Sequence, residues 1–234
     1  YFKSAYSPIW SKDIIDLAKK NNGKVIPFFK WSFNPNFYTD LLPNRSQLSS
    51  MKNNTSKFYD VGFYSNLKPY KYPKPNDENK LVSHSDYHKF GYGSEKNTGY
   101  YENSSRQNLY NYFKSSKFNW DFEEKIPYKE YLGRTFSCKT LINTPGIGEY
   151  TSRMVDCCLL GQCLILRKTS YDFGLSHKDY LPQIEFGVDG WENDLQNVID
   201  NYKEYEERSA AYFDECWSPK PMVDFLIDKI QGEL

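Results

Sequence analysis

The chain has 234 residues, with 30 Lys and Arg balancing 30 Asp and Glu, so its formal net charge at pH 7 is zero. This length suffices for one large domain or for two small α/β lobes with a substantial core. The balanced charge gives no global electrostatic reason for a nucleic-acid or membrane-surface partner. No apolar run reaches the ~20 residues that a membrane-spanning helix needs. We therefore expect neither a nucleic-acid partner nor a membrane span.

The first part of the chain predicts short helices and strands in alternation. Residues 11–22 have helical apolar spacing, and residues 34–42 form a second, shorter helical segment. Residues 24–29 and 57–64 are short apolar runs typical of strands. Residues 65–105 show no clear periodicity, which predicts a long loop.

The rest of the chain alternates between helical and strand-like segments. The predicted helices are residues 105–115, 127–133, 149–160, 191–205 and 221–230, and the predicted strands are residues 136–143, 163–167 and 182–186. Such alternation predicts an α/β fold, a Rossmann-like parallel sheet with helices on both faces. We expect a boundary near residue 55, with a short N-terminal lobe over residues 1–55 and the Rossmann-like lobe over residues 56–234.

A glycine-containing turn between a predicted strand and a predicted helix is the most informative motif. The turn reads Pro145-Gly146-Ile147-Gly148. Glycines let the backbone approach an anion, and a helix start supplies unpaired N–H groups and the positive end of the helix dipole. Arg153 and Asp156 follow three residues apart, hence on one face of that helix. They could hold a diphosphate and a ribose diol, or they could form an ordinary surface ion pair beside a turn that needs glycine only for its geometry.

The strand that follows this helix helps to separate the possible cofactors. Dinucleotide-binding folds usually place an acidic residue at the end of this strand to hold the adenosine ribose. Here the strand CLILRK ends in Arg167 and Lys168. A dehydrogenase or an ordinary methyltransferase is therefore less favoured, and Asp156, on the helix itself, is the acidic candidate.

The run from Tyr150 to Ile165, YTSRMVDCCLLGQCLI, resembles the nucleotide-sugar segment of two-lobed GT-B glycosyltransferases, particularly exostosin-like ones. In those enzymes a hydroxyl residue and Arg precede an acidic residue, an apolar stretch, Gly and a strand. The resemblance extends more loosely to DVGFYS, residues 60–65, and to PQIEF, residues 182–186. The family usually carries Glu where this chain has Asp156. The resemblance implies a GT-B-like fold, here with a reduced N-terminal lobe on the acceptor side.

The resemblance also implies a set of nucleotide-sugar-binding residues. Arg153 and the backbone and hydroxyl groups of residues 146–152 would bind the diphosphate, and Asp156 would bind the ribose. The whole expected set is Gly62, Tyr64, Ser65, Gly146, Gly148, Tyr150, Thr151, Ser152, Arg153 and Asp156.

The expected function is that of a glycosyltransferase that needs no metal and no cofactor. The other main glycosyltransferase fold generally carries an Asp-x-Asp motif for a divalent ion, and this chain has none. The donor substrate would be a UDP- or dTDP-sugar, and the acceptor an oligosaccharide. If the reaction inverts the anomeric centre, Asp40 or Asp13 is the candidate base from the N-terminal lobe, and His84 and His88 are available from the long loop. Two alternatives stay open: a non-catalytic glycan-binding module that uses the 18% aromatic residues, and an S-adenosylmethionine-dependent methyltransferase.

The abundance of Lys, Asn and Tyr and the short N-terminal lobe are similar to those of a rhamnosyltransferase domain in a multidomain glycan-assembly protein of large algal viruses. This resemblance implies L-rhamnose as the transferred sugar. We also expect a covalent connection to other domains, because the sequence begins with Tyr1 instead of Met. Five cysteines without Cys-x-x-Cys spacing argue against zinc and favour a reducing compartment. The expected location is the cytoplasm, that of the host if the protein is viral.

Overall fold

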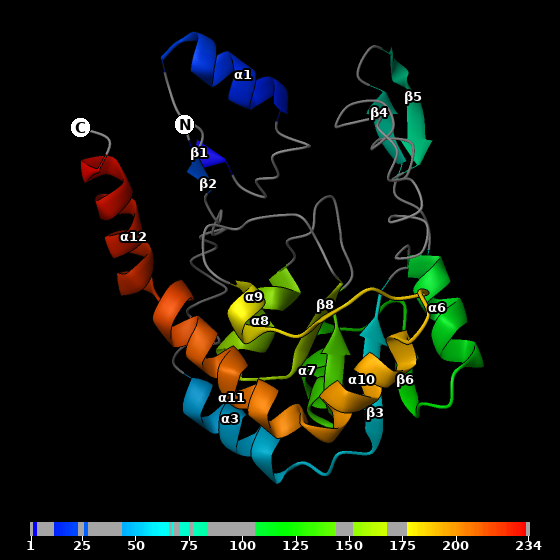
Figure 1. Ribbon diagram of the computed structural model, residues 1–234. Helices are drawn as coiled ribbons and strands as arrows, with labels where there is room; N and C mark the ends of the chain where they lie inside the picture. Colours follow the sequence, from blue (N-terminus) through cyan, green and yellow to red (C-terminus); the bar gives the residue numbers. More distant parts are fainter. Residues whose placement is uncertain are drawn as a thin grey trace.

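A five-stranded, all-parallel sheet forms the centre of the computed structural model (Figure 1), which describes residues 2–3, 12–22, 26–27, 44–65, 67, 71–74, 77–83, 106–143, 152–167 and 177–232. The strand order is β6-β3-β7-β8-β9, and every neighbouring pair is parallel. The strands are β3 (Tyr59–Tyr64), β6 (Trp120–Glu123), β7 (Cys138–Ile142), β8 (Leu164–Arg167) and β9 (Gln183–Ile184). The predicted α/β class with a parallel sheet is confirmed.

Helices cover both faces of this sheet, also as predicted. The first face packs against α6 (Arg106–Ser115) and α10 (Trp191–Asp200). The second face packs against α7 (Tyr128–Phe136), α8 (Ser152–Leu159), α11 (Tyr202–Tyr212) and the π-helical turn η1 (Phe213–Trp217). A short helix, α9 (His177–Tyr180), precedes β9, and α12 (Pro219–Gln231) ends the described chain.

Alternation along the strands divides the apolar side chains between two cores. In β3, Val61 and Phe63 belong to the core beneath α6 and α10, whereas Tyr64 belongs to the core beneath α7 and α8. In β8, Leu164 lies in the second core and Ile165 in the first. All five of these side chains are at most 2% exposed. The strands are thus apolar on both faces, as strands of a doubly covered parallel sheet must be.

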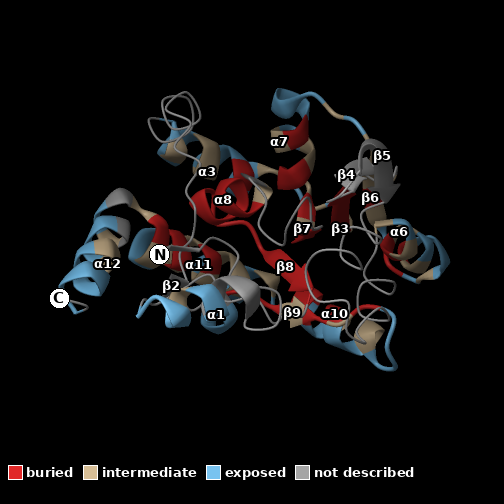
Figure 2. Ribbon diagram, turned by 90° about the horizontal axis from the view of Figure 1, so that it is seen from above, coloured by how far each residue is buried: buried red, intermediate tan, exposed pale blue. Residues whose placement is uncertain are grey.

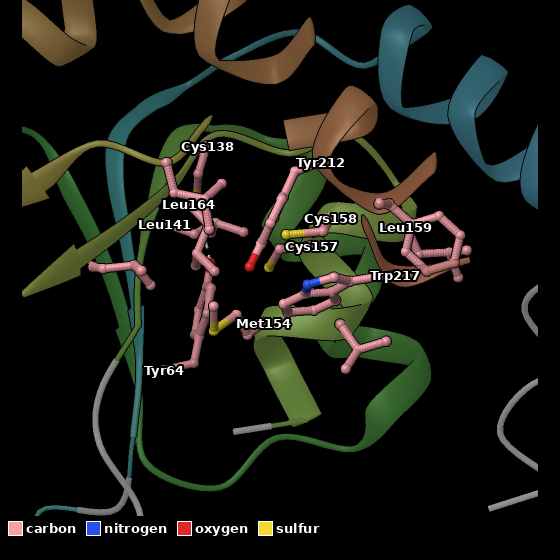
Figure 3. Packing of buried hydrophobic residues seen from close by; sticks show 14 of the residues in the cluster. Tyr64, Cys138, Leu141, Met154, Cys157, Cys158, Leu159, Leu164, Tyr212 and Trp217 are labelled. Carbon is pink, nitrogen blue, oxygen red and sulfur yellow. Dashed lines mark hydrogen bonds between the residues drawn. The ribbon is translucent and has the colours of Figure 1, made fainter. Parts of the chain in front are cut away.

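The second core is assembled from the sheet, α8 and the α11–η1 segment. Figure 3 shows Leu141 and Leu164 of the sheet facing Met154 and Cys157 of α8, with Trp217 closing the cluster from η1. Seen from above, α8, β8 and part of α11 form the most deeply buried part, while most of α12 and the described residues of α1 (Lys12–Lys20) are intermediate or exposed (Figure 2).

Helix α3 (Arg45–Asn54) was not expected, because its sequence RSQLSSMKNN is almost entirely polar. Two cations anchor it. Arg45 donates from Nε to the carbonyl oxygen of Leu159 at 2.8 Å, and Lys52 donates from Nζ to that of Gly161 at 2.6 Å. Helix α3 therefore packs with the sheet-bearing lobe although it precedes residue 55, and the boundary there stays a prediction.

Several other elements differ from expectation. The predicted helix over residues 191–205 is two helices, α10 and α11, which meet at Asn201. Strand β6 was missed, and so was a hairpin of β4 (Lys71–Lys74) and β5 (Asp77–Ser83) inside the predicted loop. Near the N-terminus, β1 (Phe2–Lys3) and β2 (Ile26–Pro27) pair in parallel. The predicted helix over residues 34–42 lies outside the described residues.

Within the described ranges, no helix combines the length and the apolar character that crossing a bilayer requires.

Gly62 gives a test of how tightly the sheet packs beneath α7. A Cβ at this position would lie 2.7 Å from Leu141 Cδ2 and 2.8 Å from Cys138 Sγ, so both side chains would have to move. We expect Gly62→Ala to lower the free energy of unfolding by about 1–3 kcal/mol in urea denaturation. Gly133→Ala is the matched control: a Cβ there meets nothing within 4 Å in helix α7, and alanine should stabilise by about 0.5–1 kcal/mol. Equal stability of Gly62→Ala and the wild type would contradict this packing.

Candidate functional site

The order in which strands are added to the sheet reverses at β3. From β3 the chain passes through α6 to β6 on one side, and then returns through α7 to β7 on the other side of β3. The connections that follow β3 and β7 thus diverge to opposite faces of the sheet, so the strand order reverses between the carboxyl ends of these two strands. In open α/β sheets, ligands bind at such a topological switch point. Ser65 and Asn143 immediately follow the two strand ends and are 6% and 4% exposed.

Arg153, the second residue of α8, reaches across this switch point. It donates from Nη1 to the carbonyl oxygen of Ile142 at 3.4 Å and from Nη2 to the carbonyl oxygen of Tyr64. Its guanidinium carbon also lies 5.8 Å from the ring centroid of Tyr131, on α7. Arg153 therefore ties the carboxyl ends of β3 and β7 together and places a positive charge between them.

Asp156 lies one turn further along α8 and is 4% exposed. Its Oδ1 atom has no hydrogen-bond partner, and no ion pair between Asp156 and Arg153 occurs among the described residues. Burial raises the pKa of Asp156 to about 7, although the nearby charge of Arg153 acts in the opposite direction. The carboxyl group is thus a buried hydrogen-bonding group with an unused oxygen, and it titrates near neutral pH.

A polar network beneath α7 borders the site. The Tyr64 hydroxyl donates to Asp121 Oδ2 at 2.6 Å, and Arg134 grips both Asp121 oxygens through Nε, at 2.9 Å, and Nη2. The Arg134 guanidinium also lies over the Tyr64 ring, 5.6 Å from its centroid. Sequence reasoning missed Asp121 and Arg134. The alternation of Trp120, Asp121 and Phe122 in WDFE is the signal that could have indicated a strand with an inward-facing acid.

The structure brings only some of the expected site residues together. Arg153, Asp156 and Ser152 share α8, and the carbonyl of Tyr64 and the backbone of Ser65 lie at the carboxyl edge. The Tyr64 side chain is instead buried beneath α7, and Gly62 lies within β3, where the absence of a Cβ makes room for neighbouring side chains.

Of the remaining expected site residues, the structure describes only Asp13. Gly146, Gly148, Tyr150, Thr151 and the candidate base Asp40 are outside the described residues. Asp13 is the second residue of α1. Among the residues that are described, no group of three His, Cys, Asp or Glu side chains is placed to hold a metal ion.

No protein-family model matches the chain, and no curated protein matches its sequence significantly.

The pKa of Asp156 makes the stability of the fold depend on pH. Because the folded-state pKa is about 7 against an ordinary value of 3.8, the folded chain keeps a proton that the unfolded chain has released, and stability should fall as pH rises from about 4 to 7. Asp156→Asn cannot ionise and should escape this loss. We expect it to gain about 2 kcal/mol more over the wild type at pH 8 than at pH 5 in chemical denaturation. Parallel pH profiles of the two proteins would contradict this assignment.

Proposed function

We propose that this chain binds a nucleoside-diphosphate sugar at the carboxyl edge of its sheet and transfers the sugar to an oligosaccharide acceptor without a metal ion. The observation that carries the proposal is the placement of Arg153 and Asp156 on α8. Arg153 is a cation at the switch point, and Asp156 is a buried carboxyl group with an oxygen that has no hydrogen-bond partner within the described part of the chain.

Arg153 would interact with the diphosphate. Its guanidinium already lies between the ends of β3 and β7, and α8 begins next to it, with its positive dipole end. Guanidinium groups pair with phosphate oxygens through several N–H donors in one plane. As the bond to the sugar breaks, negative charge grows on the leaving diphosphate. A fixed cation and helix N–H groups would lower that barrier, as a metal ion does in other transferases.

Asp156 would accept a hydrogen bond from a ribose hydroxyl. Among the described residues, no donor reaches Oδ1, and burying such an acceptor without a partner costs about 1–3 kcal/mol. A ribose hydroxyl would remove that cost on binding. It would also favour the ionised carboxylate, because a hydrogen bond donated to a charged form stabilises that form.

The transfer step itself needs no cofactor. The acceptor hydroxyl oxygen bonds to the anomeric carbon, the bond from that carbon to the diphosphate oxygen breaks, and the nucleoside diphosphate leaves with the electron pair. The hydroxyl proton goes to a base if configuration inverts, for which Asp40 and Asp13 remain our candidates, or to the leaving phosphate if it is retained.

The identity of the donor sugar and the cellular compartment are proposed from the family resemblance and from the cysteines. L-Rhamnose, carried by UDP or dTDP, rests on the family resemblance. All five cysteines are free thiols, and four of them are buried, which fits a reducing compartment such as the cytoplasm.

Calorimetric titration with UDP, with and without EDTA, tests the proposal. We expect binding under both conditions and at least a tenfold loss of affinity in Arg153→Ala, because hydrogen bonds to a charged group contribute about 1.5–3 kcal/mol. Arg45→Ala is the matched control. Arg45 also binds a backbone carbonyl of α8, but at Leu159, the opposite end of the helix, so its loss should lower stability and leave UDP affinity unchanged.

Three results would count against the proposal. Binding that EDTA abolishes would exclude the metal-independent mechanism. Unchanged UDP affinity in folded Arg153→Ala would remove the central residue. Binding of S-adenosylmethionine, or of an oligosaccharide alone, by a chain that ignores UDP would favour the methyltransferase or the glycan-binding module instead.

A further inference from the structure

Arg153 is held by contacts with β3, β7 and α7. The carbonyl oxygens of Tyr64 and Ile142 accept its hydrogen bonds, and the Tyr131 ring lies beneath its guanidinium. The two tyrosines also touch each other, edge to face, with ring centroids 5.7 Å apart. The orientation of Arg153 therefore depends on where Tyr64 and Tyr131 are held.

The position of Tyr64 is set in turn from β6 and α7. Its hydroxyl donates to Asp121 at 2.6 Å, and its ring lies under the guanidinium of Arg134. Arg134 binds both oxygens of Asp121 and makes a weaker contact with Glu123, Nη1 to Oε2 at 3.4 Å. Asp121 is 7% exposed, whereas the Arg134 side chain is 28% exposed, so the carboxylate side of this pair is the part shielded from water.

Asp121 remains a carboxylate in this setting. Burial would raise its pKa, but hydrogen bonds from Arg134 and Tyr64 outweigh burial and hold the pKa below its ordinary value. The same contacts raise the pKa of Arg134. Asp121 and Arg134 are thus both charged, and the Asp121 carboxylate fixes the hydroxyl of Tyr64.

We infer that Asp121 is a positioning residue of the carboxyl-edge site, which orients Arg153 through Tyr64 without touching the ligand. The inference rests on the proposed nucleotide site. The path is short: Asp121 fixes the side chain of Tyr64, and the carbonyl of the same residue binds Arg153. A displacement of Tyr64 would move a carbonyl that binds Arg153 and, through the ring contact, Tyr131 as well.

A double-mutant cycle with UDP affinity as the readout tests this inference. We expect Asp121→Asn to weaken UDP binding about tenfold and Tyr64→Phe, which removes only the hydroxyl, about threefold. In the Arg153→Ala background, either change should alter the remaining UDP affinity by less than about twofold. Asp60→Asn is the matched control: Asp60 pairs with Lys139 at 2.8 Å and also joins β3 to β7, but near the amino ends of the strands.

A second readout does not depend on the ligand. In ¹⁵N NMR spectra of the full chain, the Arg153 side-chain Nη–H signal, assigned by its absence in Arg153→Lys, should be sharp and protected in the wild type and in Asp60→Asn. It should exchange faster in Asp121→Asn and Tyr64→Phe. Loss of this protection in a chain that does not bind UDP would support the positioning role while the proposed function fails.

Two results would overturn the inference. One is wild-type UDP affinity and unchanged Arg153 protection in folded Asp121→Asn and Tyr64→Phe. The other is a loss of UDP affinity that persists in the Arg153→Ala background, because Asp121 would then act by a route that does not involve Arg153.

Discussion

The reversal of strand order at β3 is the constraint on which the rest of this structure depends. A parallel sheet must be covered on both faces, and the chain achieves this by adding β6 on one side of β3 and β7, β8 and β9 on the other. The reversal leaves the carboxyl ends of β3 and β7 next to each other without a crossover connection between them. Every candidate ligand contact that we describe follows from the groups gathered at these two ends.

The backbone carbonyls at these two strand ends need hydrogen-bond donors, and Arg153 supplies them. Arg153 binds both strand ends, so the same guanidinium group stabilises the fold and would contact the diphosphate. Asp156, in contrast to Arg153, destabilises the fold at neutral pH. Its carboxyl group is buried, its Oδ1 atom has no hydrogen-bond partner among the described residues, and its pKa is near 7. Costly groups of this kind concentrate at functional sites, which is why Asp156 favours a ligand over a purely structural role.

The central strands and the longer helices were predictable from sequence, because β3, β7 and β8 are rich in apolar residues and the helices between them are periodic. Helical spacing also identified Arg153 and Asp156. The features that we did not predict from the sequence depend on contacts between distant segments of the chain. Helix α3 is polar and is anchored by Arg45 and Lys52 to the end of α8 and the turn after it. Strand β6 is four residues long and carries two acids, and its buried Asp121 is stabilised by hydrogen bonds from Arg134 and Tyr64.

The measurement that tests the central claim most directly is a crystal structure of the chain with UDP. The account predicts diphosphate oxygens within hydrogen-bond distance of the Arg153 guanidinium, next to the ends of β3 and β7, and a ribose hydroxyl on Asp156 Oδ1. UDP bound elsewhere on the chain, with Arg153 and Asp156 still in their present contacts, would contradict it.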